Sequence, residues 1–240
     1  MRFERDIATA FGASVFVSRE EAALFATLAP ESAARTHHVN NGVDAEYFSP
    51  DINYHSPYRD DEDAVVFTGA MDYWPNADAA CWFSEEIFPL VLDQHPRTSF
   101  YIVGGRPLPA VKDLEKHAKV HVTGRVDDIR PYIAPAAVAV APLRIARGVQ
   151  NKVLEAMAMG KAVVGTQAAM EGIEACPGIT DRTFDSSDDF ADRVVQLLQH
   201  NDGDAPGADG RRFVVENYDW ERNLSRMEQL LAKRPDDSHI

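Results

Sequence analysis

The stretch GVQNKVLEAMAMGKAVVG at residues 148–165 combines a glycine, a lysine and a glutamate at spacings that suit an anion-binding site. Gly148 lets the backbone approach a ligand closely. Lys152 adds a positive charge near the start of a helix expected at NKVLEAMAM. Unpaired N–H groups and the helix dipole also favour negative charge at such a start. We therefore predict that the beginning of this helix binds a diphosphate.

The charges around this segment support an anion site although the whole chain is acidic. Its net charge of −14 would repel a nucleic-acid backbone, so DNA and RNA are poor partners. No acidic residue lies between Asp128 and Glu155, whereas Arg144, Arg147 and Lys152 all fall within that interval. The less specific explanation is that an apolar strand and a buried helix exclude acidic residues from this part of the sequence.

Glu155 has two possible explanations. Because Lys152 and Glu155 are three positions apart, they share one face of the expected helix. The opposite face is apolar and would meet the core: Val153, Leu154 and Met157. A carboxylate inside an anion site is useful if it accepts hydrogen bonds from neutral hydroxyls, such as those of a ribose. The alternative is an ordinary surface ion pair between Lys152 and Glu155.

The elements that would position these residues alternate between strands and helices. Apolar runs predict strands at residues 64–69, 99–105, 120–124, 137–143, 161–166 and 182–184. Helical patterns lie between them, and strands that are apolar on both faces indicate a parallel sheet covered by helices on both sides. We expect an α/β fold with a Rossmann-like, doubly wound parallel sheet.

Glycines follow the expected strands at the edge where ligands bind. In an open parallel sheet that edge lies beyond the carboxyl ends of the strands. Gly69, Gly104 and Gly124 all occur there, and Tyr73 and Trp74 follow the first strand. These two rings either stack on a sugar or base or pack under the preceding segment. Glycines also occur at such turns for backbone reasons alone, but several at one edge favour a binding site. The sequence has no GxGxxG, so it does not support a nicotinamide or flavin cofactor.

Several motifs follow one another in the order of a known family. They are SVFVSREEAALF, HHVNNGVDAEYFSPD, FYIVGG, LEAMAMGKAVVGT and YDWERNLSRMEQLL. The chain resembles the retaining group 1 glycosyltransferases of the GT-B fold over nearly its whole length. GAMDYWPN together with GVQNKVLEAMAMG is most similar to the branch associated with bacterial exopolysaccharide and PEP-CTERM sorting systems. The resemblance implies transfer of a hexose-like sugar from a nucleotide-diphosphate sugar to an acceptor glycan or lipid-linked sugar.

The resemblance also implies roles for individual residues. Glu155 matches the glutamate that holds the nucleotide ribose. The turn that contacts the base through its backbone corresponds to Gly124, Arg125 and Val126. The loop that meets the diphosphate and donor sugar corresponds to Gly148 and Val149, and we expect the next residue, Gln150, to bind the donor as well. From their place at the strand ends, and not from the resemblance, we expect Gly69 and Gly104 to lie beside the bound donor.

Two departures from the family pattern concern the charges of the site. Arg147 stands where the family has a glutamate that contacts donor-sugar hydroxyls. GAMDYWPN replaces a segment that contains an arginine and a lysine in many members, so Lys152, with Arg144, would supply the positive charge instead. Cations and a helix start can stabilise a leaving diphosphate. We therefore expect no cofactor and no metal.

The resemblance divides the chain into four parts. They are residues 1–50, the tail of an acceptor-side domain; 51–63, a linker; 64–200, the donor-binding domain; and 201–240, a connection and a C-terminal helix. Within the first part, Ser18 and Glu21 form a capping box that starts a helix. Since a complete enzyme needs two such domains, we expect this chain to bind a donor without turnover. The exposed strand at residues 13–18 is expected to favour self-association.

Two other functions stay open. A sugar-nucleotide epimerase of the same architecture would carry further catalytic carboxylates and histidines. A non-catalytic α/β interaction module would be indifferent to nucleotides. The sequence has no membrane-spanning apolar run and no signal-peptide pattern, so we expect a cytoplasmic protein. Peripheral contact of the full-length enzyme with the inner membrane is left open.

Overall fold

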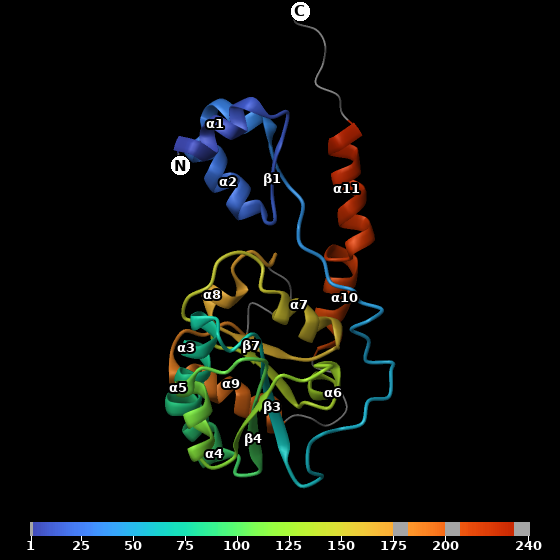
Figure 1. The fold of residues 1–240 in the computed structure, drawn as a ribbon. Helices are drawn as coiled ribbons and strands as arrows, with labels where there is room; N and C mark the ends of the chain where they lie inside the picture. The colour runs from blue at the N-terminus through green and yellow to red at the C-terminus, as the bar shows by residue number, and fades with distance from the viewer. Residues whose placement is uncertain (1, 175–181, 200–206, 233–240) are drawn as a thin grey trace, which may run out of the picture.

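The computed structural model describes residues 2–174, 182–199 and 207–232. Figure 1 shows a central sheet with helices around it, a small N-terminal unit beyond one end of the sheet, and the C-terminal helix α11 (Trp220–Ala232) beside that unit. No helix among the described residues is long and apolar enough to cross a lipid bilayer.

The central sheet has five parallel strands in the order β5–β4–β3–β6–β7. They are β3 (Asp63–Thr68), β4 (Thr98–Val103), β5 (Val120–Gly124), β6 (Val138–Ala141) and β7 (Val163–Gly165). The chain moves outward from β3 to β5 and then returns to place β6 on the other side of β3. This reversal creates a switch point between β3 and β6, where ligands bind in such sheets. The predicted doubly wound α/β fold is confirmed.

Helices cover both faces of the sheet, which explains the continuous apolar runs in its strands. On one side lie α3 (Trp74–Trp82), α4 (Phe88–Gln94), α5 (Pro109–Lys112) and α9 (Ser187–Gln199). On the other side lie α6 (Arg130–Ile133) and α7 (Asn151–Ala158), with α10 (Ala208–Asn217) packed against α7. Val65, Phe67 and Ile102 on the central strands are completely buried.

Two predicted elements differ from the observed ones near the sheet. The helical pattern at residues 76–94 is interrupted by a π-helical turn, Phe83–Ile87. Pro89 follows in the first turn of α4 and cannot donate the hydrogen bond of a continuous helix. The predicted strand at residues 182–184 is reduced to a single bridge between Thr183 and Gly165.

The predicted single C-terminal helix is also wrong. It is divided into α10 and α11 because Tyr218 turns into the core, where it is completely buried. Asp219 then forms a parallel bridge with Val43. The sequence predicts the connection at residues 201–210, but residues 208–210 already belong to α10, and residues 201–206 lie outside the described residues.

The N-terminal unit contains a two-stranded parallel sheet. Its elements are α1 (Arg2–Ala10), β1 (Ser14–Phe16), α2 (Arg19–Leu28), a 3₁₀ helix (Pro30–Arg35) and β2 (Thr36–His38). The hydroxyl of Ser18 accepts a hydrogen bond from the N–H of Glu21 at 3.1 Å, which confirms the predicted start of α2. The pairing of β1 with β2 was not predicted. Several apolar side chains of the unit remain exposed: Phe3, Phe11 and Leu24.

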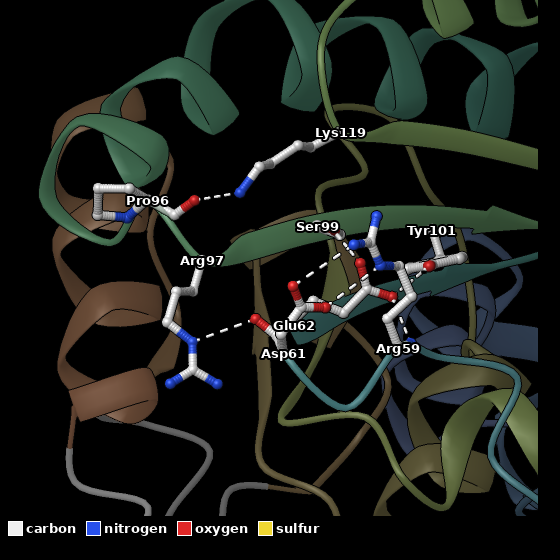
Figure 2. A network of polar contacts seen from close by, with 8 residues as sticks. All are labelled: Arg59, Asp61, Glu62, Pro96, Arg97, Ser99, Tyr101 and Lys119. Carbon is white, nitrogen blue, oxygen red and sulfur yellow. Dashed lines mark hydrogen bonds and ion pairs between the residues drawn. The ribbon is translucent and has the colours of Figure 1, made fainter.

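The segment between β2 and β3 is held against the sheet domain at its end. Tyr58 is partly buried, and its hydroxyl donates to the carbonyl of Tyr132. Figure 2 shows Glu62, which accepts hydrogen bonds from Ser99 at 2.7 Å and Tyr101 at 2.5 Å. Burial raises the pKa of Glu62, but these hydrogen bonds outweigh it and hold the pKa below its usual value.

A short chain of asparagines connects three distant segments. Asn223 of α11 is completely buried, and its amide donates to the carbonyl of Asn41 at 3.2 Å. The side chain of Asn41 in turn donates to the side chain of Asn151, the first residue of α7, at 3.3 Å. The C-terminal helix is therefore joined through Asn41 to the start of α7.

Candidate functional site

A cleft of 680 Å³ opens at the carboxyl ends of β3, β4 and β5 and at the start of α7. This is the edge at which the sequence predicts a ligand. Eight predicted residues line it: Gly69, Gly104, Arg125, Val126, Val149, Gln150, Lys152 and Glu155. The fold therefore collects residues that are far apart in the sequence into one concave surface.

Close contact between two strand ends forms the floor of the cleft. The N–H of Gly69 donates to the carbonyl of Val103 at 3.0 Å. A Cβ atom on Gly104 would lie 1.6 Å from the carbonyl oxygen of Gly69, so no other residue fits there without displacing the backbone. Glycine at this position is thus required by close packing of the strand ends.

The start of α7 presents its N–H groups without a side-chain cap. Gln150 is the N-cap residue and makes no capping hydrogen bond with its side chain. Its amide instead donates to the carbonyls of Arg147 and Gly148, both at 3.2 Å, and braces the preceding loop. Gly148 has a φ of +67°, a conformation that favours glycine. Such an open helix start can accept an anion.

Lys152 extends from α7 into the floor of the cleft. Its ammonium group donates to the side-chain oxygen of Asn76 and lies 4.8 Å from the ring centre of Phe67. Burial lowers the pKa of Lys152 to about 8, although the charge of Glu155 acts in the opposite direction. Because its protein hydrogen-bond partner is a neutral amide, the lysine can still pair with an anion.

Glu155 lines the same cleft one turn further along α7. Burial raises its pKa, and the charge of Lys152 offsets part of this effect. In the part of the chain that the structure describes, Lys152 and Glu155 form no ion pair with each other. The alternative of a surface ion pair is therefore not supported, and the carboxylate is available to hydroxyl donors.

The structure brings Lys152, but neither of the two predicted arginines, into the cleft lining. Arg144 makes two hydrogen bonds to the carboxylate of Asp78, at 3.0 and 2.5 Å. Its guanidinium also lies 5.6 Å from the ring centre of Trp82. Arg147 is exposed. Counting charges in the sequence could not reveal that Asp78 would engage Arg144.

Two glycines of the predicted site flank the cleft without lining it. Gly124 ends β5 with a φ of +68°, and a Cβ atom there would meet nothing within 4 Å. Gly148 lies beside the N-terminal unit, since a Cβ atom on it would be 3.4 Å from the carboxylate of Glu21. Arg19 forms an ion pair with Glu174 at 3.6 Å. The start of α2 therefore faces the loop before α7.

Sequence analysis missed several residues of the cleft. Asn76, Arg106 and Ile129 also line it. One signal could have identified Asn76: it lies in the first turn of the helix that follows β3, at the edge of the sheet where ligands bind. Tyr73 lines the cleft, and both Tyr73 and Trp74 are more than half exposed, so they do not pack under the preceding segment. Among the described residues, no group of three or more His, Cys, Asp or Glu side chains could hold a metal ion.

Solved structures share this fold. HepE from Anabaena, crystallised with UDP and glucose, is 18% identical with a TM-score of 0.76; the match covers 97% of this chain and 66% of HepE. Sucrose-phosphate synthase from Thermosynechococcus elongatus is 18% identical with a TM-score of 0.71, over 95% of this chain and 59% of that one. A UDP-forming trehalose-phosphate synthase from Burkholderia xenovorans is 12% identical with a TM-score of 0.71, over 95% and 62%.

The chain thus spans just under two thirds of the length of these solved chains. No curated protein matches its sequence. The family described as glycosyl transferases group 1 matches residues 62–200, which is more than half of the chain and includes the whole cleft. The chain therefore belongs to the group 1 glycosyl transferases, and its parallel sheet is that of a GT-B glycosyltransferase.

Proposed function

We propose that this chain binds the nucleotide-diphosphate sugar donor of a retaining, hexosyltransferase-like GT-B enzyme in bacterial exopolysaccharide or glycoconjugate synthesis. The observation that carries the proposal is the cleft at the carboxyl ends of β3, β4 and β5, into which α7 places both Lys152 and Glu155. HepE, which shares the fold, has also been crystallised with UDP-glucose. We accordingly favour a uridine nucleotide.

The cleft offers a different group to each part of such a donor. The turn at Arg125 and Val126, with Ile129, would contact the base. Glu155 would accept hydrogen bonds from the ribose hydroxyls, for which its carboxylate is available. The open start of α7 and the ammonium of Lys152 would hold the diphosphate.

Stabilisation of the leaving group is the chemical task of this arrangement. When the bond between the sugar C1 and the diphosphate oxygen breaks, negative charge grows on that oxygen and positive charge on the sugar. A fixed cation and fixed N–H donors stabilise the growing negative charge without reorganisation of solvent. The acceptor hydroxyl then bonds to C1, and its proton passes to the diphosphate oxygen that has left. Lys152 would therefore stabilise the transition state through the negative charge that grows on the leaving diphosphate oxygen.

We further propose that residues 1–50 belong to the acceptor side, 51–63 to a linker and 64–200 to the donor side. The N-terminal unit supports this division, because the start of α2 faces the loop before α7. On this proposal the chain binds a donor but does not turn it over, and the edge of β1 that does not pair with β2 favours self-association. Sugar transfer to a purified acceptor by this chain alone would contradict it.

Calorimetric titration with UDP, GDP, ADP and their sugar conjugates tests the donor site. We expect one nucleotide to bind. Lys152→Ala or Glu155→Ala should lower the affinity for that nucleotide about tenfold, since each substitution removes a hydrogen bond that involves a charged group. Matched controls are Lys112→Ala and Glu115→Ala, which change exposed side chains outside the cleft lining. Indifference of the folded chain to all nucleotides would favour an interaction module instead.

A further inference from the structure

One helix, α3, holds two cations in two chemically different ways. Its Asn76 accepts a hydrogen bond from the ammonium of Lys152. Its Asp78, two residues later, accepts two hydrogen bonds from the guanidinium of Arg144. An amide leaves the charge of its partner unchanged, whereas a carboxylate neutralises it. The choice of side chain on α3 therefore decides which of the two cations is paired with a carboxylate of the protein.

We propose that Asn76 is a positioning residue. Its neutral amide fixes the charged ammonium of Lys152 in the cleft without a carboxylate partner, so that the ammonium can pair with the diphosphate of the donor. The inference rests on the proposed function and deepens it. GAMDYWPN, which directly follows β3, contains no cation, so the cation that packs over the end of β3 comes from another element, α7.

The geometry around Asn76 allows its amide one orientation. The side chain is buried, with 6% of its surface exposed, and its NH₂ group donates to the carbonyl of Ala70 at 2.9 Å. A rotated amide would place its oxygen against that carbonyl and its NH₂ group against the ammonium, and neither pair can form a hydrogen bond. The amide oxygen must therefore face Lys152.

The absence of a side chain on Gly69 leaves the space that the side chains of Asn76 and Lys152 occupy. A Cβ atom on Gly69 would lie 2.8 Å from the NH₂ group of Asn76 and 3.2 Å from the ammonium of Lys152. The two side chains thus pack directly over the end of β3, with the ring of Phe67 behind the ammonium. Lys152 is held by α3, β3 and α7 at once.

The charges around Lys152 predict how the affinity for a diphosphate depends on pH. The ionisable groups of the cleft are Glu155 on the same helix and, from the other strand ends, Tyr73, Arg106 and Arg125. Arg106 is paired with Asp72 at 2.5 Å. Since burial holds the pKa of Lys152 at about 8, the free chain loses this charge above that pH. Affinity for a diphosphate should then fall as the pH rises.

The experiment substitutes Asn76 in two ways and measures UDP, GDP and ADP binding from about pH 7 to about pH 10, where the phosphates are fully ionised. Asn76→Asp keeps the size of the side chain but adds a carboxylate. It should weaken binding about tenfold and move the loss of affinity to higher pH, because a carboxylate raises the pKa of a neighbouring lysine. Asn76→Ala removes the partner without adding charge. It should also weaken binding but leave the loss of affinity at or below the wild-type pH.

A matched control variant and a test of folding distinguish a local effect at Asn76 from a general loss of structure. Asn217→Asp makes the same change on α10, outside the cleft lining, and should bind like the wild type; thermal melting verifies folding. If the wild type binds and Lys152→Ala weakens it, but both Asn76 variants bind within twofold of the wild type with the same pH profile, the inference fails and the donor site stands. If the folded wild type binds none of the three nucleotides, the inference and the proposed function both fail.

Discussion

Gly104→Ala should destabilise the fold by more than an alanine substitution normally does. The added Cβ atom would lie 1.6 Å from the carbonyl oxygen of Gly69, about 1.7 Å closer than the roughly 3.3 Å at which a carbon atom and a carbonyl oxygen meet. Relief of this clash must separate the ends of β3 and β4 and break the 3.0 Å hydrogen bond from Gly69 to Val103. Overpacking costs about 1 to 3 kcal/mol and the hydrogen bond about 1 kcal/mol, so we expect a loss of about 2 to 4 kcal/mol.

The neighbouring glycine provides the control for this experiment. A Cβ atom on Gly105 would lie 3.6 Å from the Cβ atom of Arg125, an ordinary contact, so Gly105→Ala should change stability by less than about 1 kcal/mol. Urea unfolding of both variants measures the difference, and titration with UDP should show weaker binding for Gly104→Ala. A difference in unfolding free energy below about 1 kcal/mol would refute the idea that close packing of the strand ends requires Gly104.

Three further predictions concern buried polar groups. Lys152→Met should stabilise the ligand-free chain at neutral pH by about 1 to 2 kcal/mol, since it removes a desolvated ammonium. Because the folded pKa of Lys152 is about 8 and the unfolded value 10.5, the unfolded chain holds more protons between these values, so wild-type stability should rise with pH in that window and the variant should lack the rise. Tyr58→Phe removes the hydrogen bond to the carbonyl of Tyr132; we expect a loss of about 1 kcal/mol and faster proteolysis of the segment before β3. Asn223→Asp replaces a buried amide that donates to the carbonyl of Asn41 by a carboxylate that cannot donate, and urea unfolding should show a loss of about 3 kcal/mol.

The sheet could be predicted from the sequence because burial on both faces leaves a strong local signal. β3 and β4 are covered by helices on both sides, so their residues form continuous apolar runs. The break between α10 and α11 leaves no such signal. Residues 211–232 contain neither glycine nor proline, and the turn at Tyr218 depends on a bridge between Asp219 and Val43, which are distant in the sequence.

The site could be predicted in part, for a related reason. Lys152 and Glu155 belong to one helix, so their spacing already places them on one face. The partners of the cations come from another element, α3, and nothing in the spacing shows that Asp78 meets Arg144 while Asn76 meets Lys152. Pairing across elements is a property of the tertiary fold, and local charge counts do not contain it.

The hydrogen bonds from Asn223 through Asn41 to Asn151 connect the position of α11 to that of α7. A swing of α11 with the N-terminal unit must either carry Asn41 along or break its hydrogen bonds to Asn223 and Asn151. Each broken bond costs about 1 kcal/mol, comparable to a typical coupling energy between two sites. A displacement of α11 relative to α7 would therefore have to break one of these hydrogen bonds or shift Asn151, which lines the cleft.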